Sequence, residues 1–313
     1  MSTIRIVFLG TPEFSVHALK CLREDNHFEV VGVVTQPDRP RGRKMQLTPS
    51  PVKKFANEHG LRIMTPENIN DEKVLDELIE LKAEAAVVVA FGQILSQKFL
   101  DIYPDHVVNV HTSLLPLWRG AAPVQRALMN NDSETGVSLQ KVVLKLDAGD
   151  VLGCRRLSIT DDLDGEILLR KMELLCKELL IVDFMDFMRG NLAGIKQDEL
   201  LVSYAQKIKK SESEINWQEP ARKIFNKVRA LVIGPGTWTL FNGKKIKILK
   251  TKVHSASDKF KPGFITEVSK ASITVGCGVG SLEILELQPE SRLRMTAAEF
   301  LKGNALKKGE HFG

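Results

Sequence analysis

The sequence predicts an α/β protein, with a Rossmann-like parallel or mixed sheet in its first two thirds and a small β-barrel after it. Up to about residue 200, short β-branched apolar runs alternate with amphipathic helical stretches, a pattern typical of a parallel sheet with helices on both faces. The remaining residues carry short β-like runs separated by glycines, as in oligonucleotide-binding barrels. A chain of 313 residues with 43% hydrophobic content can bury a core in each part.

The first strand is expected at residues 4–9, a β-branched apolar run that Gly10 closes, and residues 15–22 then show helical spacing. The alternation continues, and we expect strand 28–35, helix 51–60, strand 61–64, helix 71–82, strand 85–90, strand 107–111, helix 123–129, strand 136–146 and helix 164–188. Strands that alternate with helices in this way predict one sheet built mainly from parallel neighbours.

Residues 197–214 are polar and lysine-rich, and we interpret them as a connection between domains. After this stretch we expect an amphipathic helix near residues 221–231 and strands at 237–241, 245–253, 263–268, 272–277 and 282–287. The chain is therefore divided into a first domain over residues 1–200, a linker over 201–212 and a barrel domain over 213–313.

Positive charge is concentrated in the C-terminal third of the chain. Residues 1–208 carry 25 Lys and Arg against 29 Asp and Glu, whereas residues 209–313 carry 19 against 10. A basic domain beside a near-neutral one fits a polyanionic partner such as nucleic acid, because contacts with phosphates release counterions. The alternative is a solvated lysine-rich surface without a polymeric partner.

The four cysteines lie far apart and form no Cys-x-x-Cys pair. This spacing argues against a zinc site or a disulfide framework and fits a reducing compartment. The N-terminus enters a strand pattern at once and lacks the features of a signal peptide, and no apolar run approaches the ~18 residues that span a bilayer. We therefore expect a cytoplasmic protein with no membrane partner.

The first strand-to-helix turn lies where a dinucleotide-binding protein carries Gly-x-Gly-x-x-Gly. This turn contains Gly10 alone, and the bulky Pro12 and Phe14 would obstruct a close approach of the backbone to a pyrophosphate. NAD is therefore rejected as a cofactor, and the segment is interpreted as a structural turn.

Two polar side chains end the strand expected at residues 107–111. Period-two alternation puts Asn109 and His111 on one face, at the carboxyl end of the strand, where open α/β folds place ligand crevices. A bare Asn-x-His more often satisfies local backbone groups. The loop at residues 111–123, however, is rich in Leu, Pro and Trp, which fits an apolar slot for a flat heteroaromatic ligand.

Asp147 and Asp150 follow the strand expected at 136–146, in a glycine-containing turn where a carboxylate alone would usually be a turn or cap residue.

These motifs resemble the signature of the transferases that use formyl-tetrahydrofolate: Asn109 and His111, then Ser113-Leu114-Leu115-Pro116, then Leu146-Asp147-x-Gly149-Asp150. The continuation through residues 118–123, together with residues 35–43 and 48–53, is similar to the methionyl-tRNA formyltransferase family in particular. The similarity runs essentially from end to end, and the motifs are long and gapless, so that chance is a poor explanation.

The resemblance implies that Asn109, His111 and Asp147 are catalytic and that Ser113, Leu114, Leu115 and Pro116 contact the folate. It implies transfer of a formyl group from 10-formyltetrahydrofolate to methionyl-tRNA, for translation initiation. The chemistry agrees, because an amide and an imidazole can donate to the oxyanion that forms when an amine attacks a formyl carbon. Asp147 near His111 would orient the ring and stabilise its protonated form. Neither a covalent intermediate nor a metal is expected.

The resemblance also implies that a basic loop carrying Arg39, Arg41, Arg43 and Lys44 engages the acceptor end of initiator methionyl-tRNA, with Arg43 the best match. The alternative for this loop is a flexible solvated segment, and both fit a loop that orders on binding RNA. Candidates for phosphate contacts in the barrel domain are Lys209, Lys210, Lys244, Lys245, Lys247 and Lys250. We expect a monomer in a bacterial cytoplasm, because formylation of initiator methionine implies bacterial or organellar translation and no transit peptide is recognisable.

The sequence departs from the family pattern at one position and in one short segment. Thr112 stands where a glycine is usual, and residues 233–236 lack the usual prolines and aromatic residue, which puts local contacts of the barrel domain in doubt. The closest alternative functions are formyl transfer to a nucleotide-sugar amine or to glycinamide ribonucleotide, and binding of folate or RNA without catalysis. The basic loop and barrel argue against a small acceptor. The intact Asn109, His111 and Asp147 argue against a non-catalytic protein.

Overall fold

The computed structural model describes residues 3–41 and 45–313, which form two compact units. Unit 1 comprises residues 1–120, 135–157 and 169–204, and unit 2 comprises residues 121–134, 158–168 and 205–313. Each unit is therefore assembled from separate stretches of the chain. The division of the chain at residues 201–212 stays a prediction from the sequence.

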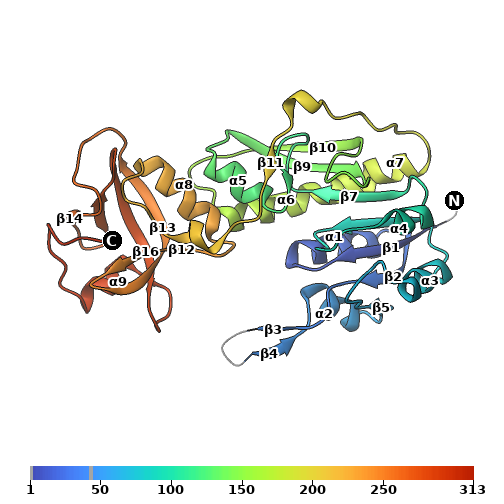
Figure 1. Cartoon of the computed structure of the whole chain (residues 1–313), viewed down its shortest axis with the longest axis horizontal. Helices are drawn as coiled ribbons and strands as arrows, with labels where there is room; N and C mark the ends of the chain where they lie inside the picture. Colours follow the sequence, from blue (N-terminus) through green and yellow to red (C-terminus); the bar gives the residue numbers. More distant parts are fainter. Residues whose placement is uncertain (1–2, 42–44) are drawn as a thin grey trace. The chain divides into compact units, whose positions relative to one another are not determined.

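Unit 1 is built on a seven-stranded mixed sheet (Figure 1). Its strands, in spatial order, are β10 (Val151–Ser158), β9 (Glu134–Lys141), β7 (Val107–His111), β6 (Ala85–Val89), β1 (Ile4–Gly10), β2 (Phe28–Val34) and β5 (Ile63–Met64). The five strands from β7 to β5 run parallel, and β9 is antiparallel to β7. The predicted Rossmann-like sheet is confirmed, and its mixed character arises at β9.

Strand β1, the middle one of the five parallel strands, is covered on both faces. Side chains alternate between the two faces of a strand, and Ile6, Val7, Phe8 and Leu9 are all fully buried. Four helices accompany the parallel strands: α1 (Glu13–Glu24), α2 (Pro51–Glu58), α3 (Glu72–Glu80) and α4 (Gln97–Ile102). The first three correspond to predicted helices, whereas α4 is a short addition. On one face of β1, Val7 and Leu9 pack with residues of α3 and α4.

The strand predicted at residues 136–146 is wrong at its end, because β9 stops at Lys141. Its partner β7 begins at Val107, and Val108 pairs with Lys141, so that residues beyond 142 have no strand to pair with. Leu144 and Leu146 are accordingly exposed. Asp147 therefore lies in an irregular turn between β9 and β10, and β10 itself is not among the predicted strands.

The long helix predicted at residues 164–188 has three parts: α6 (Gly165–Glu178), a π-helical turn (Leu179–Asp183) and α7 (Phe184–Met188). Leu179 and Phe184 are buried, as are Leu180 and Met185, so that buried side chains recur here at a spacing of five. This spacing matches the wider π-helical turn rather than the α-helical period. The apolar stripe predicts the helix, but not its change of pitch.

Several short elements are missing from the prediction, because they are too short to show a repeating pattern of apolar residues. They are the hairpin of β3 (Arg39–Arg41) and β4 (Gln46–Thr48), β8 (Arg119–Gly120), β11 (Tyr204–Ala205), β17 (Met295–Thr296), α9 (Ala297–Lys302) and two 3₁₀ turns, Glu199–Leu201 and Lys210–Ser213. Strand β11 and the two 3₁₀ turns show that the polar stretch at 197–214 is structured over part of its length.

Unit 2 is the predicted β-barrel with α-helices beside it. Its antiparallel strands are β12 (Thr237–Phe241), β13 (Lys244–Ser255), β16 (Ser281–Pro289), β15 (Ile273–Gly276) and β14 (Ile265–Val268), and its longer helices are α5 (Pro123–Met129) and α8 (Ala221–Leu231). The C-terminal residues bridge the two outer strands, because Phe312 pairs with Phe241 and His311 pairs with Phe264. No helix in the described ranges is long and apolar enough to span a membrane.

Candidate active site

His111 ends β7 with its side chain buried and both ring nitrogens facing oxygen atoms. Nε2 lies 2.9 Å from the carbonyl oxygen of Trp118, and Nδ1 lies 3.8 Å from Asp147 Oδ2. A carbonyl oxygen can only accept, so Nε2 must carry a proton. Nδ1 is then the ring nitrogen without a proton in the neutral ring, and it faces the Asp147 carboxylate.

The Asp147 carboxylate is held by two neutral donors. The Gly120 N–H donates to Oδ2 at 2.8 Å, and the Gln140 side-chain amide donates to Oδ1 at 2.9 Å. The side chain of Asp147 is 14% exposed. Charge-assisted hydrogen bonds of this kind fix the position of a carboxylate more firmly than neutral ones do. The structure therefore brings His111 and Asp147 together, as the sequence predicted.

Two residues of the tripeptide from Trp118 to Gly120 contact this pair. Trp118 supplies the carbonyl that accepts from His111, Gly120 supplies the N–H that donates to Asp147, and Arg119 lies between them. Ser203 anchors the tripeptide, because its Oγ accepts from the Trp118 N–H at 2.9 Å and its carbonyl oxygen accepts from the Arg119 N–H at 2.9 Å. The irregular loop after β7 is thus folded back as a rigid support for the site.

Asn109 lies on the same strand two residues before His111, opposite Gln140 in the register of β7 and β9. Its side chain is half-buried, and its amide makes no hydrogen bond within the part of the chain that the structure describes. Gln140, by contrast, is 1% exposed, and its amide is already engaged: the nitrogen donates to Asp147 and the oxygen accepts from Gln197. The Asn109 amide is therefore available to a ligand.

The predicted folate-contacting residues divide into two pairs. Ser113 and Leu114 are buried, and the Ser113 hydroxyl donates to the Leu117 carbonyl at 2.6 Å. Leu115 and Pro116 are half-buried. Ser138 ties this loop to β9, since its hydroxyl donates to the Ser113 carbonyl and accepts from the Leu115 N–H.

Arg119 is fully buried although it is charged. Its Nε donates to Gln197 Oε1 at 3.0 Å, and its Nη2 donates to Glu199 Oε1 at 2.9 Å. Lys145 also donates to Glu199. The hydrogen bond from Lys145 contributes most, and the one from Arg119 next, to holding the pKa of the Glu199 carboxyl below its ordinary value. Gln197 in turn donates to the carbonyl oxygens of Asp147 and Gly149.

Of the four residues of the predicted basic loop, Arg39 and Arg41 lie on β3. Arg39 pairs with Glu67, with 2.7 Å between Nη2 and Oε2, and both side chains are exposed. The backbone of Arg41 pairs with Gln46 across the hairpin. Arg43 and Lys44 lie outside the described residues. Among the described residues, no group of three or more His, Cys, Asp and Glu side chains is arranged to hold a metal ion.

The sequence did not reveal the supporting residues of the site. Gln140 could have been noticed as a polar residue in an apolar strand, opposite Asn109. Gln197, Glu199 and Ser203 carry no such signal, because they lie in the stretch interpreted as a connection between domains. Their contacts with residues 118–149 depend on the course of the folded chain alone.

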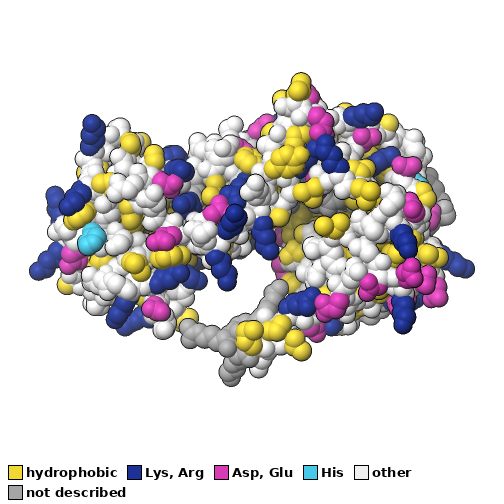
Figure 2. Space-filling view, viewed as in Figure 1, with side chains coloured by type: hydrophobic (Ala, Val, Ile, Leu, Met, Phe, Trp, Pro, Cys, Tyr) yellow, Lys and Arg dark blue, Asp and Glu magenta, His cyan; other side chains and the backbone are white. Residues whose placement is uncertain are grey.

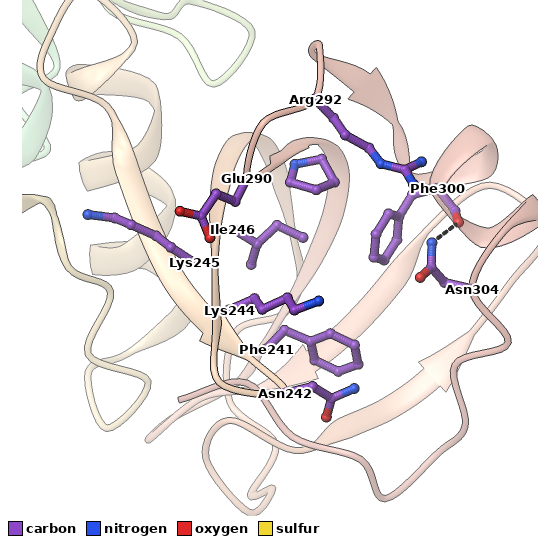
Figure 3. A pocket seen from close by; sticks show the side chains of 10 residues that line it. Phe241, Asn242, Lys244, Lys245, Ile246, Glu290, Arg292, Phe300 and Asn304 are labelled. Atoms are coloured by element: carbon purple, nitrogen blue, oxygen red, sulfur yellow. Dashed lines mark hydrogen bonds between the residues drawn. The ribbon is translucent and has the colours of Figure 1, made fainter.

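Two surface cavities lie away from the predicted catalytic residues. One, of about 430 Å³, is in unit 2 and is lined by Phe241, Asn242, Lys244, Lys245, Ile246, Pro289, Glu290, Arg292, Phe300 and Asn304 (Figure 3). Figure 3 shows the Lys245 side chain pointing away from the rings of Phe241 and Phe300. The other, of about 330 Å³, lies in unit 1 beside α4 and residues 141–144. Neither is lined by Asn109, His111 or Asp147.

Comparison with known proteins identifies the family to which this geometry belongs. Residues 4–182 match the formyl transferase family, and residues 207–305 match the formyl transferase C-terminal domain. The methionyl-tRNA formyltransferase of Bdellovibrio bacteriovorus is 53% identical over 317 aligned residues, which cover 100% of both chains. That of Geobacter metallireducens is 41% identical, again with full coverage of both chains.

Among solved structures, the N-formyltransferase from Helicobacter canadensis in complex with folinic acid and dTDP-3-aminofucose shares the fold. Its TM-score is 0.68 at 20% identity, and the match covers 92% of this chain and all of the other. At that identity the likeness concerns the fold alone. The full-length identity to the two bacterial relatives is far higher and covers both units. The chain therefore belongs to the methionyl-tRNA formyltransferase family.

Proposed function

We propose that this protein transfers the formyl group of 10-formyltetrahydrofolate to the free amino group of initiator methionyl-tRNA, producing N-formylmethionyl-tRNA. The observation that carries this proposal is the 53% identity to a methionyl-tRNA formyltransferase over the full length of both chains. The site supports it because an available amide, a buried imidazole and a carboxylate suit acyl transfer to an amine.

The Asn109 amide would donate a hydrogen bond to the oxyanion that forms when the amine attacks the formyl carbon. His111 would act through Nδ1, since its Nε2 proton is engaged by the Trp118 carbonyl. The proton lost by the attacking amine would pass to Nδ1, and Asp147 at 3.8 Å would stabilise the positive ring until the proton moves to the departing folate nitrogen. A neutral amine needs no covalent enzyme intermediate for this reaction.

The folate would lie beside the loop after β7. Leu115 and Pro116 are half-buried and can offer apolar contact to a pterin ring, whereas Ser113 and Leu114 would shape the loop from within. The folinic acid bound by the Helicobacter canadensis N-formyltransferase gives independent support for a folate site on this fold.

The barrel would hold the tRNA through its phosphates. On β13 the side chains of Lys245 and Lys247 are exposed while those of Ile246 and Ile248 are buried, so that the lysines share the outer face of the strand. Figure 2 shows Lys and Arg side chains spread over the visible face of this unit. Such contacts position an RNA without reading its sequence.

Arg39, Arg41, Arg43 and Lys44 would engage the acceptor end of the tRNA. Arg39 is already paired with an exposed Glu67, and an exposed ion pair is weak enough for a phosphate to replace the carboxylate. We further propose that the protein acts in the bacterial cytoplasm as a monomer.

The test is single-turnover formyl transfer from 10-formyltetrahydrofolate to methionyl-tRNA, with wild type, His111→Ala and the exposed control His27→Ala. We expect the first variant to lose on the order of a hundredfold to a thousandfold in rate and the control to match wild type. A wild-type protein that ignored methionyl-tRNA but formylated an amino-sugar nucleotide would refute the acceptor while leaving the fold intact.

A further inference from the structure

We propose that Gln197 and Arg119 are positioning residues of the reaction, which together set the place of Asp147 relative to His111. This inference rests on the proposed function, because it assumes that Asp147 acts on the imidazole. Both residues are remote from Asp147 in sequence, by 50 and 28 positions, and neither touches a reacting atom in the arrangement described above.

The orientation of the Gln197 amide is dictated by its neighbours. Arg119 Nε can only donate, so the Gln197 atom that faces it at 3.0 Å must be the oxygen. The amide nitrogen is thereby directed at the carbonyl oxygens of Asp147 at 2.9 Å and Gly149 at 2.7 Å, and more distantly at Gln140 Oε1 at 3.4 Å. Arg119 thus orients Gln197, and Gln197 holds the turn that carries the carboxylate.

The turn needs such support because Asp147 has a left-handed backbone conformation, with φ of 48°. Residues other than glycine adopt this region at a cost and keep it where the surroundings hold them there. The Gln197 amide binds the carbonyl of the strained residue itself. The N–H of Gly120, the residue after Arg119, donates to the carboxylate of Asp147. Hydrogen bonds from these two residues therefore fix both the backbone and the side chain of Asp147.

A purely stabilising role explains Arg119 poorly. Its side chain is fully buried, yet its Nη1 has no hydrogen-bond partner within the described ranges. A buried charge with an unsatisfied donor costs free energy, and apolar residues of similar volume often stabilise a core better. A guanidinium at this place supplies two donors in a rigid geometry, to Gln197 and Glu199, and that geometry fits a positioning role.

The sharpest test is Gln197→Glu. A glutamate keeps an acceptor for Arg119 but replaces the donated hydrogen bonds by repulsion between its carboxylate and three acceptors, the carbonyls of Asp147 and Gly149 and the side-chain oxygen of Gln140. Gln288→Glu is the matched control, because Gln288 also donates to a backbone carbonyl, that of Arg292, but in unit 2. We expect Gln197→Glu to lower kcat by roughly tenfold to a hundredfold, with the KM values of both substrates within about threefold of wild type.

A second readout does not depend on activity. The Gly120 amide proton, observed by NMR in protein with ¹⁵N-labelled glycine, reports the hydrogen bond to Asp147 Oδ2. We expect its resonance to move upfield in Gln197→Glu and to stay in place in Gln288→Glu. An unchanged kcat or an unchanged Gly120 resonance in Gln197→Glu overturns the inference.

If Gln197→Glu does not fold, Arg119→Lys takes its place with the same criteria, because lysine keeps the charge but has no equivalent of the Nε donor. The NMR readout also separates this inference from the proposed function. If the wild-type protein does not formylate methionyl-tRNA, the proposed function is refuted. A Gly120 resonance that still moves in Gln197→Glu would then show that the positioning contact exists nonetheless.

Discussion

The carbonyl oxygen of Trp118 lies 2.9 Å from Nε2 of His111, and this contact fixes which nitrogen of the ring carries the proton. Trp118 holds that position with a left-handed backbone, φ 59°, although it is a bulky residue. Its N–H is bound by Ser203 Oγ, which stabilises the conformation. The tautomer of the central imidazole is therefore set by a loop residue and by a serine 85 positions further along the chain.

Asn109→Ala should remove the donor that we assign to the oxyanion. Because the amide makes no hydrogen bond to other described residues, its loss should leave the free energy of unfolding nearly unchanged. We expect kcat to fall on the order of a hundredfold to a thousandfold, with little change in either KM. Steady-state kinetics beside Asn57→Ala, an exposed position on α2, would check this. A loss confined to KM would contradict the assigned role.

Gly149→Ala should distort the Asp147 turn. A Cβ at this position would overlap the backbone carbonyl of Lys141, which belongs to the end of β9 and cannot move aside cheaply. We expect a loss of about tenfold or more in kcat, since small displacements of a catalytic group are costly. Gly303→Ala is the control, because a Cβ there meets nothing and φ is −107°. Equal activity of the two variants would show that the turn tolerates displacement.

Lys245→Gln combined with Lys247→Gln should weaken tRNA binding without affecting the chemistry. We expect a higher KM for methionyl-tRNA and an unchanged KM for the folate. A plot of log affinity against log salt should be less steep by roughly one unit for each phosphate that is no longer neutralised. Lys73→Gln on α3 removes an exposed lysine from unit 1 for comparison. A salt dependence identical to that of wild type would argue against phosphate binding by β13.

The Arg126–Glu212 ion pair should make stability depend on pH. The hydrogen bond from Arg126 lowers the pKa of the Glu212 carboxyl in the folded state. The pKa of Glu212 in the folded protein lies below its unfolded pKa, near 4.3, so the ion pair contributes fully to the free energy of unfolding above that pH. This contribution disappears as the pH falls through the folded pKa. Glu212→Gln should therefore lower the free energy of unfolding at pH 7 by roughly 0.2–1 kcal/mol, with the difference shrinking in acid. Urea titrations at several pH values, with the exposed Glu58→Gln alongside, would measure it; a difference that grew in acid would contradict the sign.

The four cysteines should differ in their reaction with iodoacetamide. Cys154 is exposed, whereas Cys21, Cys176 and Cys277 are buried. Burial raises the pKa of all three buried thiols, that of Cys277 to about 12, so that little reactive thiolate is present at pH 8. Mass spectrometry should find native protein alkylated at Cys154 and all four sites alkylated in guanidinium chloride. Rapid alkylation of Cys277 in the native protein would show that the barrel core opens readily.

Apolar periodicity, which is a local property of the sequence, predicted most of the longer strands and helices, although it missed β10. The sequence also placed Asn109 and His111 on one face of β7, since alternation along a strand is geometric. The local pattern did not predict where β9 ends, because that end depends on the partner strand: β9 stops at Lys141, near the point where β7 begins at Val107.

The contacts that hold the site follow from the tertiary fold and not from any pattern in the sequence. Gln197 meets Arg119 across 78 positions and Asp147 across 50, and no periodicity links residues so far apart. The backbone groups of Trp118 and Gly120 contact His111 and Asp147 without any side-chain signal, because every residue type offers a carbonyl and nearly every type an N–H. Residue type therefore identified the groups that carry the chemistry, whereas the course of the folded chain determined what orients them.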